Sequence, residues 1–277
     1  MQQELKLRIV SGVILAVLVL LATWYGGVAF SLLSALIGLL IYYEWSTITK
    51  LATEQPVANA IGWLGQAAIA VAVVAGTLGY SLILLALFFL IAVGFVFVSG
   101  VSRWFPTGIV YAGLTGIALS SIRGADSVGL FAMLFVFAVV WSTDILAYFV
   151  GRAIGGPKLA PKISPGKTWS GAIGGAISAV IAGSLVAYFA VPQSVVLAAS
   201  VAFILSVCSQ SGDLFESFIK RRFGVKDSSH LIPGHGGVMD RVDGLIFACF
   251  AAFLLAGLFS LIKGGEMTSL GAALFGV

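Results

Sequence analysis

The stretch VGLFAMLFVFAVVWSTDILAYFV, residues 128–150, is almost wholly apolar and carries a single charge, at Asp144. A helix needs about 20 mostly apolar residues to cross a bilayer, so this stretch predicts a transmembrane helix. A charge within such a helix is costly, and an intramembrane acid is therefore a functional candidate. The alternative for Asp144 is a structural ion pair with a loop cation such as Arg152.

Eight further apolar runs accompany this one. The expected spans are 9–25, 28–43, 60–78, 81–99, 107–122, 128–150, 170–190, 193–212 and 243–262. Only 9% of the 277 residues are charged, against about 25% in an average soluble domain, so lipid must cover most of the surface. The sequence predicts an all-α, polytopic integral membrane protein of about nine transmembrane helices. Eight is the alternative, because the run 107–122 is weak.

Charged and aromatic residues at the span ends set the orientation. With nine spans and a cytoplasmic N-terminus, all of the 15 Lys and Arg residues except Arg123 and Lys263 are cytoplasmic, as the positive-inside rule requires. We expect a multi-pass protein of the cell (inner) membrane, and the net charge of +4 indicates orientation, not nucleic-acid binding. Glu44 and Trp45, at the end of the second span, read as anchors at the membrane interface.

The charges also divide the chain into two parts. Residues 1–125 have short loops and scattered charges, and we expect them to form a scaffold of helices that could carry a dimer interface. Residues 126–277 contain two polar loops, 151–169 and 213–241, which we expect to be cytoplasmic and catalytic.

The first loop, 151–169, is predicted to bind an anion. Ser164 and Thr168 can donate hydrogen bonds, and the loop leads into a helix N-terminus, where free N–H groups favour phosphate. Gly-Lys-Thr at 166–168 resembles the end of a P-loop, but Pro161 stands where that motif needs glycine, so a P-loop is excluded. The alternative is that the cations only contact anionic lipid headgroups. These cations are Arg152, Lys158, Lys162 and Lys167.

The second polar region interleaves cations with acids, which a simple membrane anchor would not need. Its acids are Asp213, Glu216, Asp227, Asp240 and Asp243. Asp240 and Asp243 are three apart and would share one face of a helix. Gathered carboxylates suit Mg²⁺, which takes oxygen ligands and works with substrate phosphates. His235, within Pro-Gly-His-Gly-Gly, would contact phosphate or a metal-bound water, or would instead stabilise its own loop, whereas His230 reads as structural.

The same region carries a resemblance to a known family. The residues concerned are Ser217-Phe-Ile-Lys220-Arg221, Lys226-Asp227 and Ile232-Pro-Gly-His-Gly-Gly-Val-Met-Asp240-Arg-Val-Asp243. This pattern resembles that of phosphatidate cytidylyltransferase, also called CDP-diacylglycerol synthase, and Gly212-Asp213 and Ser164-Pro-Gly-Lys-Thr168 are similar to it as well. Two positions depart from the family pattern: Ser170 stands where an acid is common, and Ile145 where a small or hydroxyl residue is usual.

The resemblance implies an activity. It is transfer of the cytidylyl group of CTP to phosphatidic acid, which gives CDP-diacylglycerol and pyrophosphate for phospholipid synthesis. The resemblance also implies dependence on Mg²⁺, with room for a second metal ion, and a homodimer. The alternatives are a CTP-dependent polyprenol kinase or a cytidylyltransferase acting on another lipid phosphate. A secondary transporter is disfavoured because no internal repeat is visible.

The resemblance and the charges together suggest a role for each candidate residue. The expected metal ligands are Asp213 and Asp240, with Asp243 as a third ligand or a partner of one. The expected catalytic side chains are Lys220, Lys226 and Arg241 on the phosphates, and Ser217 and His235 as hydrogen-bond donors. The expected substrate-binding residues are Ser164, Lys167, Thr168, Arg221 and Asp144.

Overall fold

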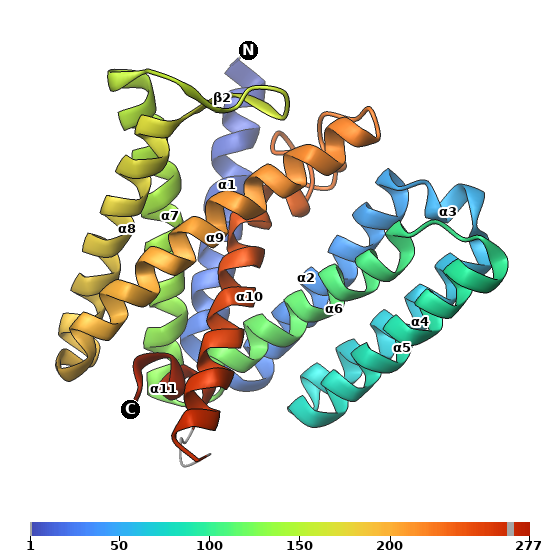
Figure 1. Ribbon diagram of the computed structural model, residues 1–277, viewed down its shortest axis with the longest axis horizontal. Coiled ribbons are helices and arrows are strands. Elements are labelled where there is room, and N and C mark those ends of the chain that lie inside the picture. The colour runs from blue at the N-terminus through green and yellow to red at the C-terminus, as the bar shows by residue number, and fades with distance from the viewer. Residues whose placement is uncertain (1, 265–268) are drawn as a thin grey trace. The chain divides into compact units, whose positions relative to one another are not determined.

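The computed structural model describes the backbone of residues 2–264 and 269–277, and side chains from Ile9 onward. Lys6 and Arg8 were counted in the predicted orientation, but their side chains lie outside the part of the chain that the structure describes. The elements are α1 (Gln2–Tyr25), α2 (Gly27–Ile48), α3 (Leu51–Glu54), α4 (Pro56–Val74), α5 (Leu78–Ser99), α6 (Trp104–Arg123), α7 (Ser127–Ile154), β1 (Lys158–Ala160), β2 (Ser164–Thr168), α8 (Trp169–Ala190), η1 (Pro192–Ser194), α9 (Val195–Arg222), α10 (Met239–Ile262) and α11 (Leu270–Phe275) (Figure 1).

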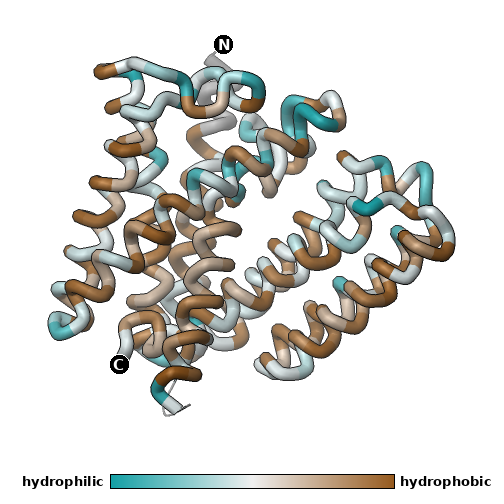
Figure 2. The backbone as a smooth tube through the Cα atoms, viewed as in Figure 1, coloured by the Kyte–Doolittle hydropathy of each residue, from teal (hydrophilic) through white to brown (hydrophobic). Residues whose placement is uncertain are grey.

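The fold class expected from the sequence is confirmed. In the described part of the chain, eight helices are long and apolar enough to cross a membrane, and a shorter apolar helix covers Ile9–Tyr25. Apolar residues run along these helices, and hydrophilic residues gather at helix ends and in the connections (Figure 2). Many large apolar side chains are exposed, such as Val98 at 87% and Phe189 at 80%. In water such exposure would be costly, so the protein is a polytopic membrane protein with lipid around its helices.

The chain forms two compact units. The first comprises 1–120 and 222–241, and the second comprises 121–221 and 242–277. The segment that carries most of the family pattern therefore packs with the N-terminal helices. The roles expected for residues 1–125 and 126–277 stay predictions.

The core of the first unit is built from large aromatic side chains set against glycines. Trp45 is fully buried, and its indole Nε1–H donates to the carbonyl of Trp104 at 2.9 Å. Gly108 packs against the Trp45 ring, where a side chain would clash. Glu44 is also fully buried. The expectation that Glu44 and Trp45 anchor the membrane interface is therefore wrong, because both side chains point into protein.

In the second unit, α7 and α8 lie side by side (Figure 1). A Cβ on Gly171 would lie 2.6 Å from the carbonyl oxygen of Ala147, and one on Gly175 would lie 2.8 Å from that of Thr143. Small residues let helix backbones approach closely in a membrane. This close approach holds Asp144, which follows Thr143 on α7, beside the start of α8.

The second polar region is more helical than the expected loop 213–241. α9 continues to Arg222, so the connection to α10 begins only at residue 223. Hydropathy shows where a helix leaves the apolar layer of the membrane, but it does not show where the helix ends. The polar residues after Asp213 include good helix formers, so the helix continues through them. Glu216 and Lys220, four residues apart, form an ion pair at 2.6 Å. Gly224, at φ 72°, follows the helix end.

The first polar loop contains structure that an all-α reading omits. β1 and β2 form an antiparallel hairpin in which Lys158 pairs with Thr168 and Ala160 with Ser164. Gly155 and Gly156 have φ values of 66° and 102° and turn the chain out of α7. Strands of three and five residues are too short to show an alternating pattern, so the sequence did not reveal them.

Candidate active site

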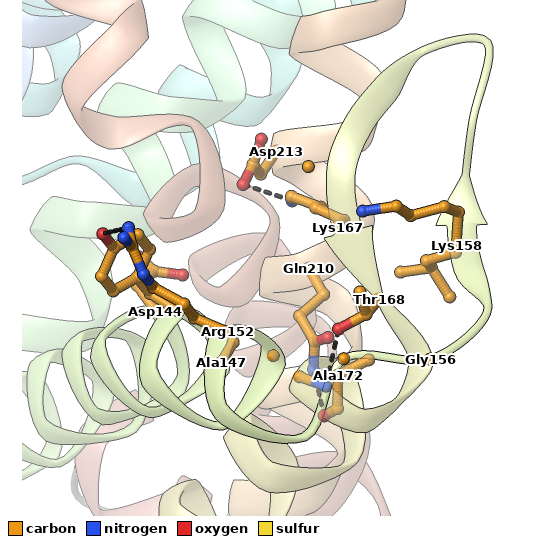
Figure 3. A pocket seen from close by; sticks show the side chains of 16 residues that line it. Asp144, Ala147, Arg152, Gly156, Lys158, Lys167, Thr168, Ala172, Gln210 and Asp213 are labelled. Atoms are coloured by element: carbon orange, nitrogen blue, oxygen red, sulfur yellow. Dashed lines mark hydrogen bonds and ion pairs between the residues drawn. The ribbon is translucent and has the colours of Figure 1, made fainter.

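A cavity of about 580 Å³ lies in the second unit, between α7, the hairpin, α8 and α9 (Figure 3). Ligand pockets typically measure roughly 300–1,000 Å³. Its polar lining residues are Asp144, Tyr148, Arg152, Lys158, Lys167, Thr168, Gln210 and Asp213. The cavity brings together four residues that the sequence singled out from three separate segments: Asp144, Lys167, Thr168 and Asp213.

An ion pair connects the hairpin to α9 at the edge of this cavity. The Lys167 ammonium contacts the Asp213 carboxylate (Figure 3). The two side chains keep 25% and 32% of their surface exposed, so each remains accessible to a ligand. An exposed ion pair of this kind contributes little to stability, and an arriving phosphate or cation can therefore exchange for one partner.

Two further carboxylates, Asp144 and Asp243, lie near this pair. Asp144 and Asp213 both line the cavity, and both lie within electrostatic range of Asp243. α9 and α10 pass closely here, since a Cβ on Gly212 would lie 2.6 Å from the backbone oxygen of Asp243. The Asp243 carboxylate accepts from the N–H of Gly244 at 2.8 Å. Arg152 donates to the Tyr148 hydroxyl at 3.0 Å.

The N-terminus of α8 also faces the cavity, and Thr168 caps it. The Thr168 hydroxyl accepts from the Gly171 N–H at 3.1 Å, which is the usual bond of an N-cap residue. Ser170 donates to the carbonyl of Gly155 and so fixes the turn after α7. This gives Ser170 a local structural contact.

Other candidates on the same unit lie away from the cavity. Lys220 is paired with the buried carboxylate of Glu216. Ser164 pairs with Ala160 in the hairpin. Among the described residues, the cavity lining does not include Ser164, Ser217, Lys220 or Arg221. Sequence reasoning missed Gln210, which lies one turn before Asp213 on α9 and lines the cavity; the three-residue spacing from Asp213 was the available signal.

The remaining candidates belong to the first unit, where Asp240 organises the segment before α10. One carboxylate oxygen, Oδ2, accepts from the Ser228 N–H at 2.8 Å, the Ser228 hydroxyl at 2.7 Å and the Gly237 N–H at 2.8 Å. Lys226 and Arg241, in the same unit, are exposed. Their predicted contacts with phosphate stay predictions.

His235 and its turn are held against α1 by Ser11. The Ser11 hydroxyl donates to the carbonyl of Pro233 at 3.0 Å, and its oxygen lies 2.9 Å from Nδ1 of His235. Gly234 and Gly236, at φ 75° and 85°, allow the tight turn around it.

Known proteins match the chain along most of its length. A family model described as the cytidylyltransferase family matches residues 6–259. A phosphatidate cytidylyltransferase of Brucella abortus biovar 1 (strain 9-941) is 44% identical over 269 residues, which cover 93% of this chain and 95% of that protein. A phosphatidate cytidylyltransferase of Rickettsia typhi (strain Wilmington) is 33% identical over 252 residues, covering 88% and 89%. With a family model over nearly the whole chain and such relatives beside it, the chain belongs to the phosphatidate cytidylyltransferase family.

Proposed function

We propose that this chain transfers the cytidylyl group of CTP to phosphatidic acid and releases CDP-diacylglycerol and pyrophosphate. The observation that carries the proposal is the cavity, which is lined together by an intramembrane acid, Asp144, by the cationic hairpin and by Asp213. Such a site can hold a charged headgroup and a nucleotide at the edge of the apolar layer. It belongs to a chain whose full-length relatives bear the name of this activity.

The reaction needs no nucleophile from the protein. An oxygen of the lipid phosphate attacks the α-phosphorus of CTP, and the bond to the β-phosphate oxygen breaks. Both reactants are anions, so the difficulty is to bring them together in line. Positioning and charge neutralisation supply most of the catalysis in transfers of this kind.

The cavity offers cations for this purpose. Arg152, Lys158 and Lys167 line it, and the positive end of the α8 dipole, which favours phosphate, faces it as well. In the proposed complex Lys167 leaves Asp213 for a phosphate oxygen. Lys226 and Arg241, exposed beside the Pro-Gly-His-Gly-Gly turn, would hold further phosphate charge.

The donor chemistry fits Mg²⁺. Asp213 and Asp243 would hold it, with Asp240 as the further proposed ligand and a second ion as an extension of the same proposal. Within the described residues no group of three or more His, Cys, Asp or Glu side chains forms a ready-made metal site. Mg²⁺ usually binds through one or two carboxylates plus substrate phosphates, so nucleotide phosphates would complete its coordination. When bound, the ion neutralises phosphate charge and polarises the phosphorus under attack.

We further propose that the N-terminus and the polar loops face the cytoplasm, where CTP is made, and that the protein works as a homodimer. The acyl chains of phosphatidic acid would remain in lipid and reach the cavity from the side.

The direct test is a product assay. Purified protein is incubated with radiolabelled CTP, Mg²⁺ and phosphatidic acid, and the lipid products are separated. Labelled CDP-diacylglycerol is expected, at a rate that depends on both substrates. Parallel reactions contain a polyprenol or a polyprenol phosphate in place of phosphatidic acid. A product only in those reactions would reject the proposal in favour of a kinase or transferase acting on another lipid.

A further inference from the structure

Glu44 is a buried carboxylate that the proposed mechanism leaves unused. It lies on α2, a membrane-spanning helix, and has 0% of its surface exposed. Its neighbours Ile41, Tyr42 and Trp45 are fully buried as well. A charge removed from water is costly unless hydrogen bonds compensate it, so the partners of Glu44 indicate its purpose.

Among the described residues, the polar groups within hydrogen-bond distance of the Glu44 carboxylate come from segment 228–239. Oε1 accepts from the Ser229 hydroxyl at 2.6 Å and the Val238 N–H at 2.7 Å. Oε2 accepts from the Met239 N–H at 2.6 Å, and the Ser228 hydroxyl oxygen lies 3.1 Å from it. Three of these bonds have the short lengths typical of charge-assisted hydrogen bonds. None of the ion pairs among the described side chains involves Glu44.

Two of these donors define the start of α10. Val238 precedes the helix and Met239 is its first residue. The first N–H groups of a helix have no partner within it and carry partial positive charge. Glu44 thus caps α10 from a different helix, far away in the sequence. The next two residues of α10 are Asp240 and Arg241, both proposed to serve the reaction.

Glu44 is also tied to Asp240 through a shared residue. The Ser228 hydroxyl lies 3.1 Å from Oε2 of Glu44 and 2.7 Å from Oδ2 of Asp240. Gly237 lies against both Ser228 and Glu44, where a Cβ would collide with their side chains. Segment 228–239 therefore packs around two carboxylates, Glu44 and Asp240, and Asp240 is proposed to bind a metal.

We propose that Glu44 is a positioning residue for cytidylyl transfer. It holds segment 228–239 and the first turn of α10 in the one arrangement that presents Asp240 and Arg241 to the reactants. It acts through its hydrogen bonds and does not touch substrate. The inference rests on the proposed function of the Asp240 segment, and it adds a residue that the resemblance did not indicate.

The test compares Glu44→Gln with Glu54→Gln. Gln keeps the shape of Glu44, but its amide nitrogen would face N–H or O–H donors and lose their bonds. Glu54 is a matched control, because its side chain is 65% exposed and, among the described side chains, its ion pair is with the exposed Lys50. Measurements are kcat and KM for each substrate, the melting temperature, and hydrogen exchange of segment 228–239.

For Glu44→Gln we expect kcat to fall at least about tenfold, because several charge-assisted bonds are lost. KM should change little, and amide hydrogens of segment 228–239 should exchange faster. Glu54→Gln should match the wild type. Wild-type kcat in folded Glu44→Gln would overturn the positioning role. Failure of the proposed function is distinct, since the wild-type protein itself would then make no CDP-diacylglycerol.

If Glu44→Gln does not accumulate, Ser229→Ala and Glu44→Asp decide. Ser229→Ala removes one donor and retains the others. Glu44→Asp shortens the side chain and weakens its hydrogen bonds, but it keeps the buried charge. Reduced kcat at a wild-type melting temperature in both supports positioning. Wild-type kcat in both overturns it.

Discussion

At the scale of single residues, Asp240 has two roles: it accepts hydrogen bonds that hold the segment before α10, and it is a proposed metal ligand. One of its oxygens accepts three hydrogen bonds from Ser228 and Gly237. These bonds fix the orientation of the carboxylate. Carboxylates that bind metals are usually held in this way by hydrogen bonds from neighbouring groups. In the proposed mechanism the same carboxylate binds Mg²⁺.

We predict that Asp240→Asn abolishes turnover while the protein still inserts into the membrane. The amide retains an oxygen that can accept the three bonds, so the loss in folding free energy should be modest, about 0.5–1.5 kcal/mol per weakened bond. The lost negative charge, however, removes a proposed metal ligand. Turnover and melting temperature are measured together. Substantial turnover at ordinary Mg²⁺ concentrations would remove Asp240 from the metal site.

A second residue-scale prediction separates phosphate-binding cations from those that only set orientation. Lys226→Ala should lower kcat/KM by roughly ten- to a hundredfold, the worth of one charge-assisted hydrogen bond. Lys50→Ala should change it less than about twofold, since one cytoplasmic cation is dispensable for topology. Lys50 is exposed and lies near Glu54, 4.0 Å away.

The comparison is made in detergent, with CTP and lipid varied separately, because an effect confined to KM would indicate ground-state binding. Equal, small effects at Lys226 and Lys50 would mean that the cations of the second polar region are lipid anchors.

At the scale of elements, the contact between α7 and α8 positions the cavity. Gly171 and Gly175 bring the α8 backbone against Ala147 and Thr143. The hairpin then reaches from α7 to α8, and its Lys167 contacts Asp213 on α9. A change in the helix spacing would therefore move the acid of α7 relative to the lysine of β2.

We predict that Gly171→Ala lowers both stability and turnover. Its Cβ would lie 2.6 Å from the backbone oxygen of Ala147, and backbone cannot rotate away. Overpacking of this kind costs about 1–3 kcal/mol. The control is Gly257→Ala on α10, where nothing lies within 4 Å of the added Cβ. That variant should keep its activity and melt at the same or a higher temperature, because alanine favours helix. Equal melting temperatures for both variants would contradict the close packing.

The helices and strands also show which parts of the secondary structure could be predicted from the sequence. Long apolar runs predicted the membrane helices, because burial in lipid depends on composition alone. The helical turns between Asp213 and Arg222 and the β1–β2 hairpin were missed, because polar composition does not distinguish a helix end, a short strand and a loop. Cavity residues Asp144, Lys167, Thr168 and Asp213 were found from charge and resemblance.

Glu44 was misread for a further reason. A carboxylate at the end of an apolar run looks the same whether it faces water or another segment. Its partner Ser228 is 184 positions away in the sequence, and no local pattern reveals such a contact. Ser11 was missed likewise, because a lone polar residue on a membrane helix has no distinguishing context.

At the scale of the whole molecule, orientation decides whether the site meets CTP. We predict that the connections 151–169 and 223–238 face the cytoplasm, since thirteen of the 15 Lys and Arg residues then lie on that side. Single cysteines are introduced at Lys162 and His230, which are exposed, in a background with Cys208 and Cys249 replaced by alanine. The control is a cysteine at Lys263, also exposed and expected on the opposite side.

In intact cells an impermeant thiol reagent should label only the cysteine at 263, because the bilayer shields the other two. All three should react once the membrane is broken, which shows that shielding and not burial protected them. The same three variants must retain turnover, so that the labelled protein is the folded one. Labelling of position 162 or 230 from outside would place that connection, and the phosphate-binding residues beside it, on the side of the membrane without CTP.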